Sequence, residues 1–120
     1  MIRVLVVDDN PAFLNAALDV VAVTSGFELA GVARSGEEAI EQAAATRPDL
    51  VLIDLRMPGM DGREAASRIK EAQPETRVVL MTADSGRSAA GDAEADSPVI
   101  EKRTLGPAAL AAVWESLGQS

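Results

Sequence analysis

The sequence contains no histidine and no cysteine among its 120 residues. Without histidine, the chain lacks the most common general base, the most common zinc ligand and any Ser-His-Asp triad. Without cysteine, it lacks disulfides, thiolate metal ligands and a cysteine nucleophile. These absences exclude several classes of enzyme and metal site, and they mean that the chain cannot itself carry a phosphohistidine.

Aromatic residues and positive charge are also scarce. The aromatic side chains are Phe13, Phe27 and Trp114, which leaves almost nothing for base stacking. The net charge of −8 repels phosphate backbones and anionic membranes. No apolar run approaches the roughly 18 residues of a membrane span, and the first run, residues 4–7, is too short for a signal peptide. We therefore expect a cytoplasmic chain that binds neither nucleic acid nor membrane directly.

The length and the hydrophobic pattern predict one domain over residues 1–120. Strands are predicted over residues 2–7, 28–33, 49–53, 77–81 and 99–101. Helices are predicted from 11 to about 24, from about 35 to 47, and over 62–73 and 105–117. This alternation predicts an α/β fold: a doubly wound, five-stranded parallel sheet with helices on both faces.

Two of the predicted helices differ sharply in quality. The first carries an apolar stripe at Phe13, Ala16, Ala17, Val20 and Val21. By contrast, residues 84–97 contain mostly Gly, Ser, Ala and Asp, so a fourth helix there is expected to be weak or partly disordered.

Five polar residues lie at or just after the ends of predicted strands: Asp8, Asp9, Asp54, Thr82 and Lys102. The carboxyl ends of parallel strands share one edge of the sheet, where ligands of such folds bind. Carboxylates held close together repel, so a lysine or a metal must lie among them. Oxygen ligands with open positions suit a hard cation such as Mg²⁺.

A carboxylate beside such a metal can attack phosphorus and form an acyl phosphate, and Asp54 is the candidate nucleophile. Lys102 would neutralise the phosphoryl oxygens, and the Thr82 hydroxyl would donate a hydrogen bond to them. Taken singly, each residue also has a plain structural interpretation. The acids suit helix starts and turns, Thr82 suits a strand, and Lys102 suits a solvated surface. Their joint order along the chain favours the functional interpretation.

Four motifs carry a resemblance to a known family: VVDDN at 6–10, LIDLRMPGMDG at 52–62, LMTA at 80–83, and Lys102. Together they resemble the receiver domain of two-component response regulators, over essentially the whole chain. The resemblance implies a flavodoxin-like fold. It also implies that Asp54 takes a phosphoryl group from a phosphohistidine on a sensor histidine kinase or a phosphotransfer protein.

The resemblance further implies a role for each site residue. It implies a Mg²⁺ site formed by Asp8, acting partly through water, with Asp9, Asp54 and the Arg56 backbone carbonyl. It implies that the phosphoryl group is received by Thr82, the Ala83 N–H and Lys102. Such a chain is not a dedicated enzyme, although it catalyses its own phosphorylation and slow dephosphorylation. Its implied partners are a C-terminal output domain or a separate effector, and a homodimer on phosphorylation is left open.

Two positions depart from the family pattern. Val99 stands where receivers usually carry an aromatic residue, and Arg103 stands where proline usually follows the lysine. These departures keep open a receiver-like binding module that works without phosphorylation. A Mg²⁺-dependent phosphohydrolase is a third reading, but such enzymes typically place a general acid two residues after the nucleophile, where this chain has Arg56.

Overall fold

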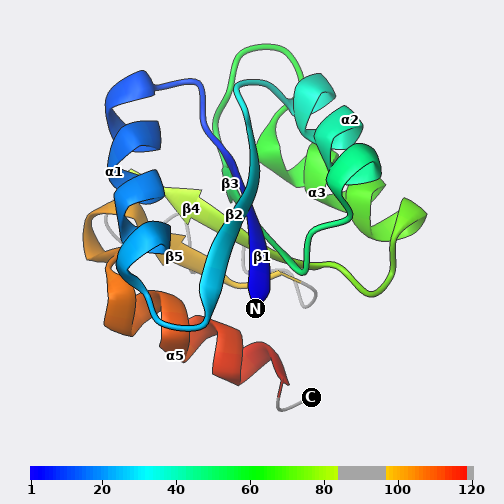
Figure 1. Cartoon of the computed structure of the whole chain (residues 1–120). Coiled ribbons are helices and arrows are strands. Elements are labelled where there is room, and N and C mark those ends of the chain that lie inside the picture. The colour runs from blue at the N-terminus through cyan, green and yellow to red at the C-terminus, as the bar shows by residue number, and fades with distance from the viewer. Residues whose placement is uncertain (84–96, 119–120) are drawn as a thin grey trace.

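The computed structural model describes residues 1–83 and 97–118, and these form a parallel sheet covered by helices (Figure 1). The strands are β1 (Ile2–Val7), β2 (Phe27–Ala33), β3 (Leu50–Asp54), β4 (Arg77–Thr82) and β5 (Val99–Glu101). The helices are α1 (Pro11–Val23), α2 (Gly36–Thr46), α3 (Gly62–Ala72) and α5 (Pro107–Gly118), with a 3₁₀ turn, η1, at Lys102–Thr104. The strand order β2-β1-β3-β4-β5 is the flavodoxin-like arrangement, so the predicted fold class is confirmed.

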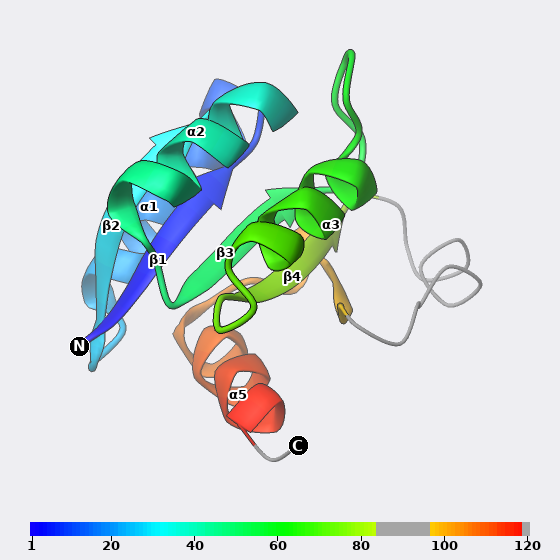
Figure 2. The ribbon, with the colours of Figure 1, turned by 90° about the vertical axis from the view of Figure 1, so that its right-hand side faces the viewer.

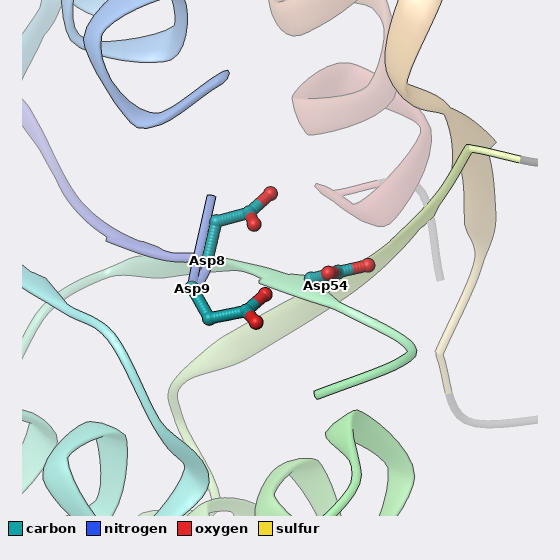
Figure 3. Close-up of side chains that lie close together, drawn as sticks. All are labelled: Asp8, Asp9 and Asp54. Atoms are coloured by element: carbon teal, nitrogen blue, oxygen red, sulfur yellow. The ribbon is translucent and has the colours of Figure 1, made fainter. Parts of the chain in front are cut away.

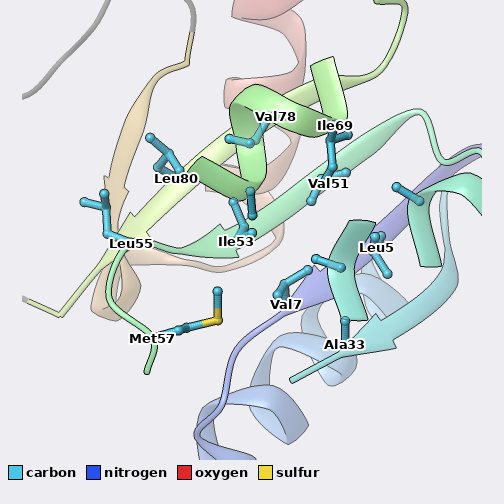
Figure 4. Packing of buried hydrophobic residues seen from close by; sticks show 14 residues of the cluster. Leu5, Val7, Ala33, Val51, Ile53, Leu55, Met57, Ile69, Val78 and Leu80 are labelled. Atoms are coloured by element: carbon cyan, nitrogen blue, oxygen red, sulfur yellow. The ribbon is translucent and has the colours of Figure 1, made fainter. Parts of the chain in front are cut away.

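Both faces of the sheet are covered, as Figures 1 and 2 show. A cluster that packs α1 and α5 onto one face includes Val4, Val6, Leu50, Leu52, Val79 and Met81. The cluster in Figure 4 packs α2 and α3 onto the opposite face and includes Leu5, Val7, Val51, Ile53, Val78 and Leu80. Each fully buried Val, Leu or Ile contributes roughly 1.5–3 kcal/mol of hydrophobic stabilisation. Because alternate side chains are buried on opposite faces, these strands read as unbroken apolar runs.

The buried stripe of α1 differs from the predicted one. Its buried residues are Leu14, Ala17 and Val21, whereas Ala16 is exposed. The sequence prediction included Ala16 and left out Leu14, which was wrong. The helix buries Leu14 and exposes Ala16, because burying the larger apolar side chain of leucine stabilises the fold more than burying the methyl group of alanine.

The last helix begins two residues later than predicted. We expected it over 105–117, but α5 spans Pro107–Gly118. Pro107 occupies its first position, and the Leu110 N–H donates to the Gly106 carbonyl at 2.8 Å. The expected weak fourth helix at residues 84–97 lies, apart from residue 97, outside the described residues. Within the described part, no helix is both long and apolar enough to cross a bilayer.

Strand β2 lies at one edge of the sheet and contains a bulge. Its pairing with β1 runs from Val4 opposite Leu29 to Leu5 opposite Gly31, which leaves Ala30 as an extra residue. The bulge changes which side chains face each side of the sheet, so Gly31 faces Leu5 and α2. Leu29 remains 45% exposed on this edge strand.

Candidate functional site

The sequence-predicted polar residues meet at the carboxyl edge of the sheet. The last paired positions of neighbouring strands are Val7 with Ile53, Asp54 with Met81, and Thr82 with Glu101. Asp8 therefore follows β1 directly beside the end of β3, where Asp54 is the last strand residue. Thr82 ends β4, and Lys102 follows its neighbour β5. The strands are added to one side of β1 first and then, from β3 onward, to its other side. The site lies at this switch point between β1 and β3, where such sheets bind ligands.

Three carboxylates converge at this edge, as Figure 3 shows. One oxygen from each of Asp8, Asp9 and Asp54 lies within 4.8 Å of the others. Asp8 is fully buried, Asp54 is 7% exposed and Asp9 is exposed. Two of the three negative charges are therefore held away from water, where their repulsion is least screened.

Lys102 places a positive charge between the two buried carboxylates. Its Nζ lies 2.6 Å from Asp8 Oδ2 and 3.3 Å from Asp54 Oδ2, and its side chain is 14% exposed. At these distances the ammonium group forms an ion pair with each of the two carboxylates. The lysine thus offsets part of the repulsion that the sequence pattern implies, since its single positive charge lies beside the carboxylates of Asp8 and Asp54.

The turn after β5 directs Lys102 into the site and Arg103 away from it. Arg103 Nε donates to Glu101 Oε1 at 3.0 Å on the surface. The Thr104 hydroxyl donates to the Glu101 carbonyl at 2.8 Å, and the Leu105 N–H donates to the Lys102 carbonyl at 3.1 Å. These bonds close the turn without a proline after the lysine.

Asp54 holds its proton more tightly than a free aspartate does. Burial raises the pKa of the Asp54 carboxyl, and the nearby Asp8 charge raises it further. Lys102 and the Arg56 N–H, which donates to Asp54 Oδ1 at 3.3 Å, act in the opposite direction. A further cation at this edge would favour the ionised carboxylate, which is the form that can act as a nucleophile.

The donor set fits a hard divalent cation. It consists of carboxylate oxygens from Asp8, Asp9 and Asp54, and the chain has no imidazole or thiolate to add. Ions such as Mg²⁺ prefer such ligands and retain several waters. One lysine does not neutralise three carboxylates, so a divalent cation held by them would also offset the repulsion that remains.

The remaining predicted residues lie around this cluster. Thr82 is 2% exposed at the end of β4, and the exposed Ala83 follows it. The side chain of Arg56 is exposed, while its N–H contacts Asp54 as described above. Val99 packs against the cluster beneath α2 and α3.

The loop from β3 to α3 depends on two glycines. Gly59 has φ +80°, a conformation that side chains disfavour, and it follows Pro58 in the predicted turn. Gly62 begins α3 and donates from its N–H to the Leu55 carbonyl at 2.9 Å. A Cβ on Gly62 would lie 2.1 Å from the carbonyl oxygen of Asp54. The chain around Asp54 therefore requires close backbone contact with the start of α3.

One residue at the site was missed from the sequence. Phe13 lies in the first turn of α1, and Lys102 Nζ is 4.7 Å from the centroid of its ring. The helix start is fixed by Asn10, whose side chain accepts from the N–H groups of Ala12 at 2.9 Å and Phe13 at 3.4 Å. Asp8 Oδ1 in turn accepts from the Asn10 N–H at 2.9 Å. The sequence feature that could have indicated Phe13 is its position in the first turn of the helix that follows Asp8 and Asp9.

Comparison with known proteins gives consistent matches. The family model described as the response regulator receiver domain matches residues 4–102. The response regulator GacA of Pseudomonas viridiflava is 40% identical over 82 residues, which are 68% of this chain and 38% of that protein. The response regulator protein VraR of Staphylococcus aureus (strain Mu3 / ATCC 700698) is 35% identical over 122 residues, covering 99% of this chain and 58% of VraR. The chain thus spans less than two-thirds of the length of either relative.

A solved structure agrees with the sequence comparisons. The signal receiver domain of the putative response regulator NarL from Mycobacterium tuberculosis aligns with a TM-score of 0.83 and 29% identity. The alignment covers 96% of this chain and 94% of that one. The similarity extends across the sheet and helices described above.

Proposed function

Because this chain belongs to the response regulator receiver domain family of two-component signalling, we propose that it accepts a phosphoryl group on Asp54 in the presence of Mg²⁺. The proposed receiver comprises residues 1–120. The observation that carries the proposal is Lys102, which lies between the buried carboxylates of Asp8 and Asp54 with Asp9 close by. Such a charge arrangement suits the transfer of an anionic group.

In the proposed reaction, an Asp54 oxygen attacks the phosphorus of a phosphohistidine. The new O–P bond forms as the P–N bond breaks, and the imidazole keeps the bonding electron pair and takes up a proton from solvent. Lys102 neutralises charge on the phosphoryl oxygens, while the Thr82 hydroxyl and the Ala83 N–H donate hydrogen bonds to them. The chain mainly positions the phosphoryl group and stabilises its charge.

The residues that would hold the metal are Asp8, Asp9 and Asp54, with the backbone carbonyl of Arg56. When bound, Mg²⁺ would neutralise part of the phosphoryl charge and favour ionised Asp54. Asp8 also keeps Lys102 in place before the phosphoryl group arrives, since its Oδ2 lies 2.6 Å from Nζ.

A receiver-like module without phosphorylation is less well supported. Its sequence arguments were Val99, Arg103 and the expected weakness of residues 84–97. Of these, Arg103 in place of the usual proline still leaves a turn after β5 that directs Lys102 to the carboxylates. A module without phosphoryl chemistry would have little physical reason to bury two carboxylates and a lysine together. A dedicated phosphohydrolase is not favoured either. Such enzymes typically place a general acid two residues after the nucleophile, and this chain has Arg56 there.

The proposal extends to partners that the chain's chemistry implies. The donor would be a sensor histidine kinase or a phosphotransfer protein in the cytoplasm. The phosphorylated state would act on a C-terminal output domain or a separate effector, with a homodimer as an alternative output. The net charge of −8 argues against direct nucleic acid binding by these residues.

Intact mass spectrometry tests the proposal directly. The chain is incubated with phosphoramidate and Mg²⁺, alongside Asp54→Ala and an EDTA control. We expect one phosphoryl group on the native chain and none in either control. A native chain that binds Mg²⁺ but gains no phosphoryl group would refute the proposal and favour the phosphorylation-independent module. Rapid turnover of phosphate monoesters would instead support a hydrolase.

A further inference from the structure

We propose that Phe13 is a positioning residue for phosphoryl transfer, which holds the ammonium group of Lys102 at the site through the face of its ring. This inference rests on the proposed function, because it concerns the lysine that would receive the phosphoryl oxygens. The sequence pattern of acids, threonine and lysine gives Phe13 no part in that chemistry. Its contact with Lys102 is what assigns it one.

The contact has the geometry of a cation–π interaction. Lys102 Nζ lies 4.7 Å from the centroid of the Phe13 ring, inside the range of about 6 Å over which a ring attracts an ammonium group. The lysine side chain is only 14% exposed, so water screens this attraction less than it would at the surface. The ring accepts no conventional hydrogen bond, so the ammonium protons remain directed to carboxylate or phosphoryl oxygens.

The ring itself is held by the local structure of α1. Asn10 caps the helix through the N–H groups of Ala12 and Phe13, and Pro11 occupies the first helical position. Phe13 also packs against the hydrophobic cluster beneath α1 and α5. It is therefore fixed to the same β1–α1 connection that carries the acidic pair.

This arrangement matters because Lys102 has a second task during the reaction. Before transfer its ammonium contacts Asp8 and Asp54, and afterwards it must reach the phosphoryl oxygens on Asp54. Attraction to the ring face extends to about 6 Å from the centroid, so it persists through a small shift of the ammonium group over that face. A leucine at position 13 would fill similar space but would let the long lysine side chain occupy more rotamers.

The test compares initial phosphorylation rates of the native chain, Phe13→Leu and Phe13→Tyr with phosphoramidate and saturating Mg²⁺, followed by intact mass. We expect Phe13→Leu to react about fivefold more slowly, and Phe13→Tyr to stay within about twofold of the native rate because it keeps a ring. The matched control is Phe27→Leu, the same change in the same cluster at the opposite end of the sheet. It should lower the melting temperature but leave the rate unchanged.

A double-mutant cycle separates positioning from packing. In EDTA, the fall in melting temperature on Phe13→Leu should be smaller in a Lys102→Met background than in the native chain, because the attracted charge is gone. Equal falls in both backgrounds would overturn the proposal, as would a native phosphorylation rate in Phe13→Leu. Failure of the native chain to accept any phosphoryl group would instead overturn the proposed function itself, and the role of Phe13 in transfer with it.

Discussion

Gly62→Ala is expected to damage both stability and the phosphoryl site. Gly62 is buried, and its new Cβ would lie 2.1 Å from the Asp54 carbonyl oxygen and 2.9 Å from the Leu55 Cα. These are backbone atoms, so no change of side-chain rotamer can relieve the overlap. Either the start of α3 or the chain after β3 must move by about 1 Å, in an interior that is packed at crystal density.

The expected cost is about 3 kcal/mol of unfolding free energy, the upper part of the range for overpacked cores. For a domain of this size that corresponds to a melting temperature lower by about 12 °C. Urea unfolding followed by the fluorescence of Trp114, together with thermal unfolding by circular dichroism, measures both quantities. Because the overlapping carbonyl belongs to Asp54 itself, the rate of phosphorylation should fall as well.

Gly106→Ala is the matched control. Among residues 1–83 and 97–118, no heavy atom outside the immediate chain neighbours lies within 4 Å of a Cβ at Gly106, and the Gly106 backbone is outside the left-handed region. Its stability should remain within about 1 kcal/mol of the native value, with a small gain favoured by the stiffer unfolded chain. A Gly62→Ala variant as stable as Gly106→Ala would refute the steric argument.

Three further predictions concern the charges and the helix cap. Burial and Asp8 raise the pKa of Asp54, so the folded chain loses stability as pH rises from 3.8, the ordinary value, through the raised pKa. In EDTA, the stability advantage of Asp54→Asn should therefore grow as the pH rises above 3.8, and a pH-independent advantage would contradict this. Lys102→Met leaves buried carboxylates without their cation and should cost about 3 kcal/mol. Added Mg²⁺ should restore more stability in that variant than in the native chain, whereas Arg103→Met should change little in thermal unfolding. Asn10→Ala should cost about 1 kcal/mol in urea unfolding, and the exposed Asn15→Ala almost nothing; equal effects would argue against the cap.

Much of the fold could be predicted, because strands that are buried on both faces of the sheet appear in the sequence as continuous apolar runs. The apolar runs before Asp8 and Asp54 marked two inner strands, and the parallel alternation then required both acids to lie at one edge. The site was predictable to the extent that it depends on strand ends. This is why the sequence predicts Thr82 and Lys102 at the same edge of the sheet as the acids.

Other features depend on contacts that a single sequence does not contain. Lys102 and Arg103 are adjacent cations, and the sequence predicted Lys102 as the site residue without showing the hydrogen bonds that keep Arg103 on the surface. Leu14 and Ala16 both fit an apolar stripe, and the packing of α1 selects the larger. Phe13 looked like an ordinary core residue, because its contact with Lys102 joins segments 89 positions apart along the chain.

The bulge in β2 has a consequence for how this domain behaves in a crowded solution. A straight edge strand with exposed apolar side chains offers another molecule a template for adding a strand, which is a common first step toward aggregation. Ala30 interrupts that template beside Leu29, because the extra residue twists the strand and breaks the regular spacing of its outward-facing amide groups. The edge can therefore keep an exposed leucine with less risk that neighbouring molecules join their sheets through it.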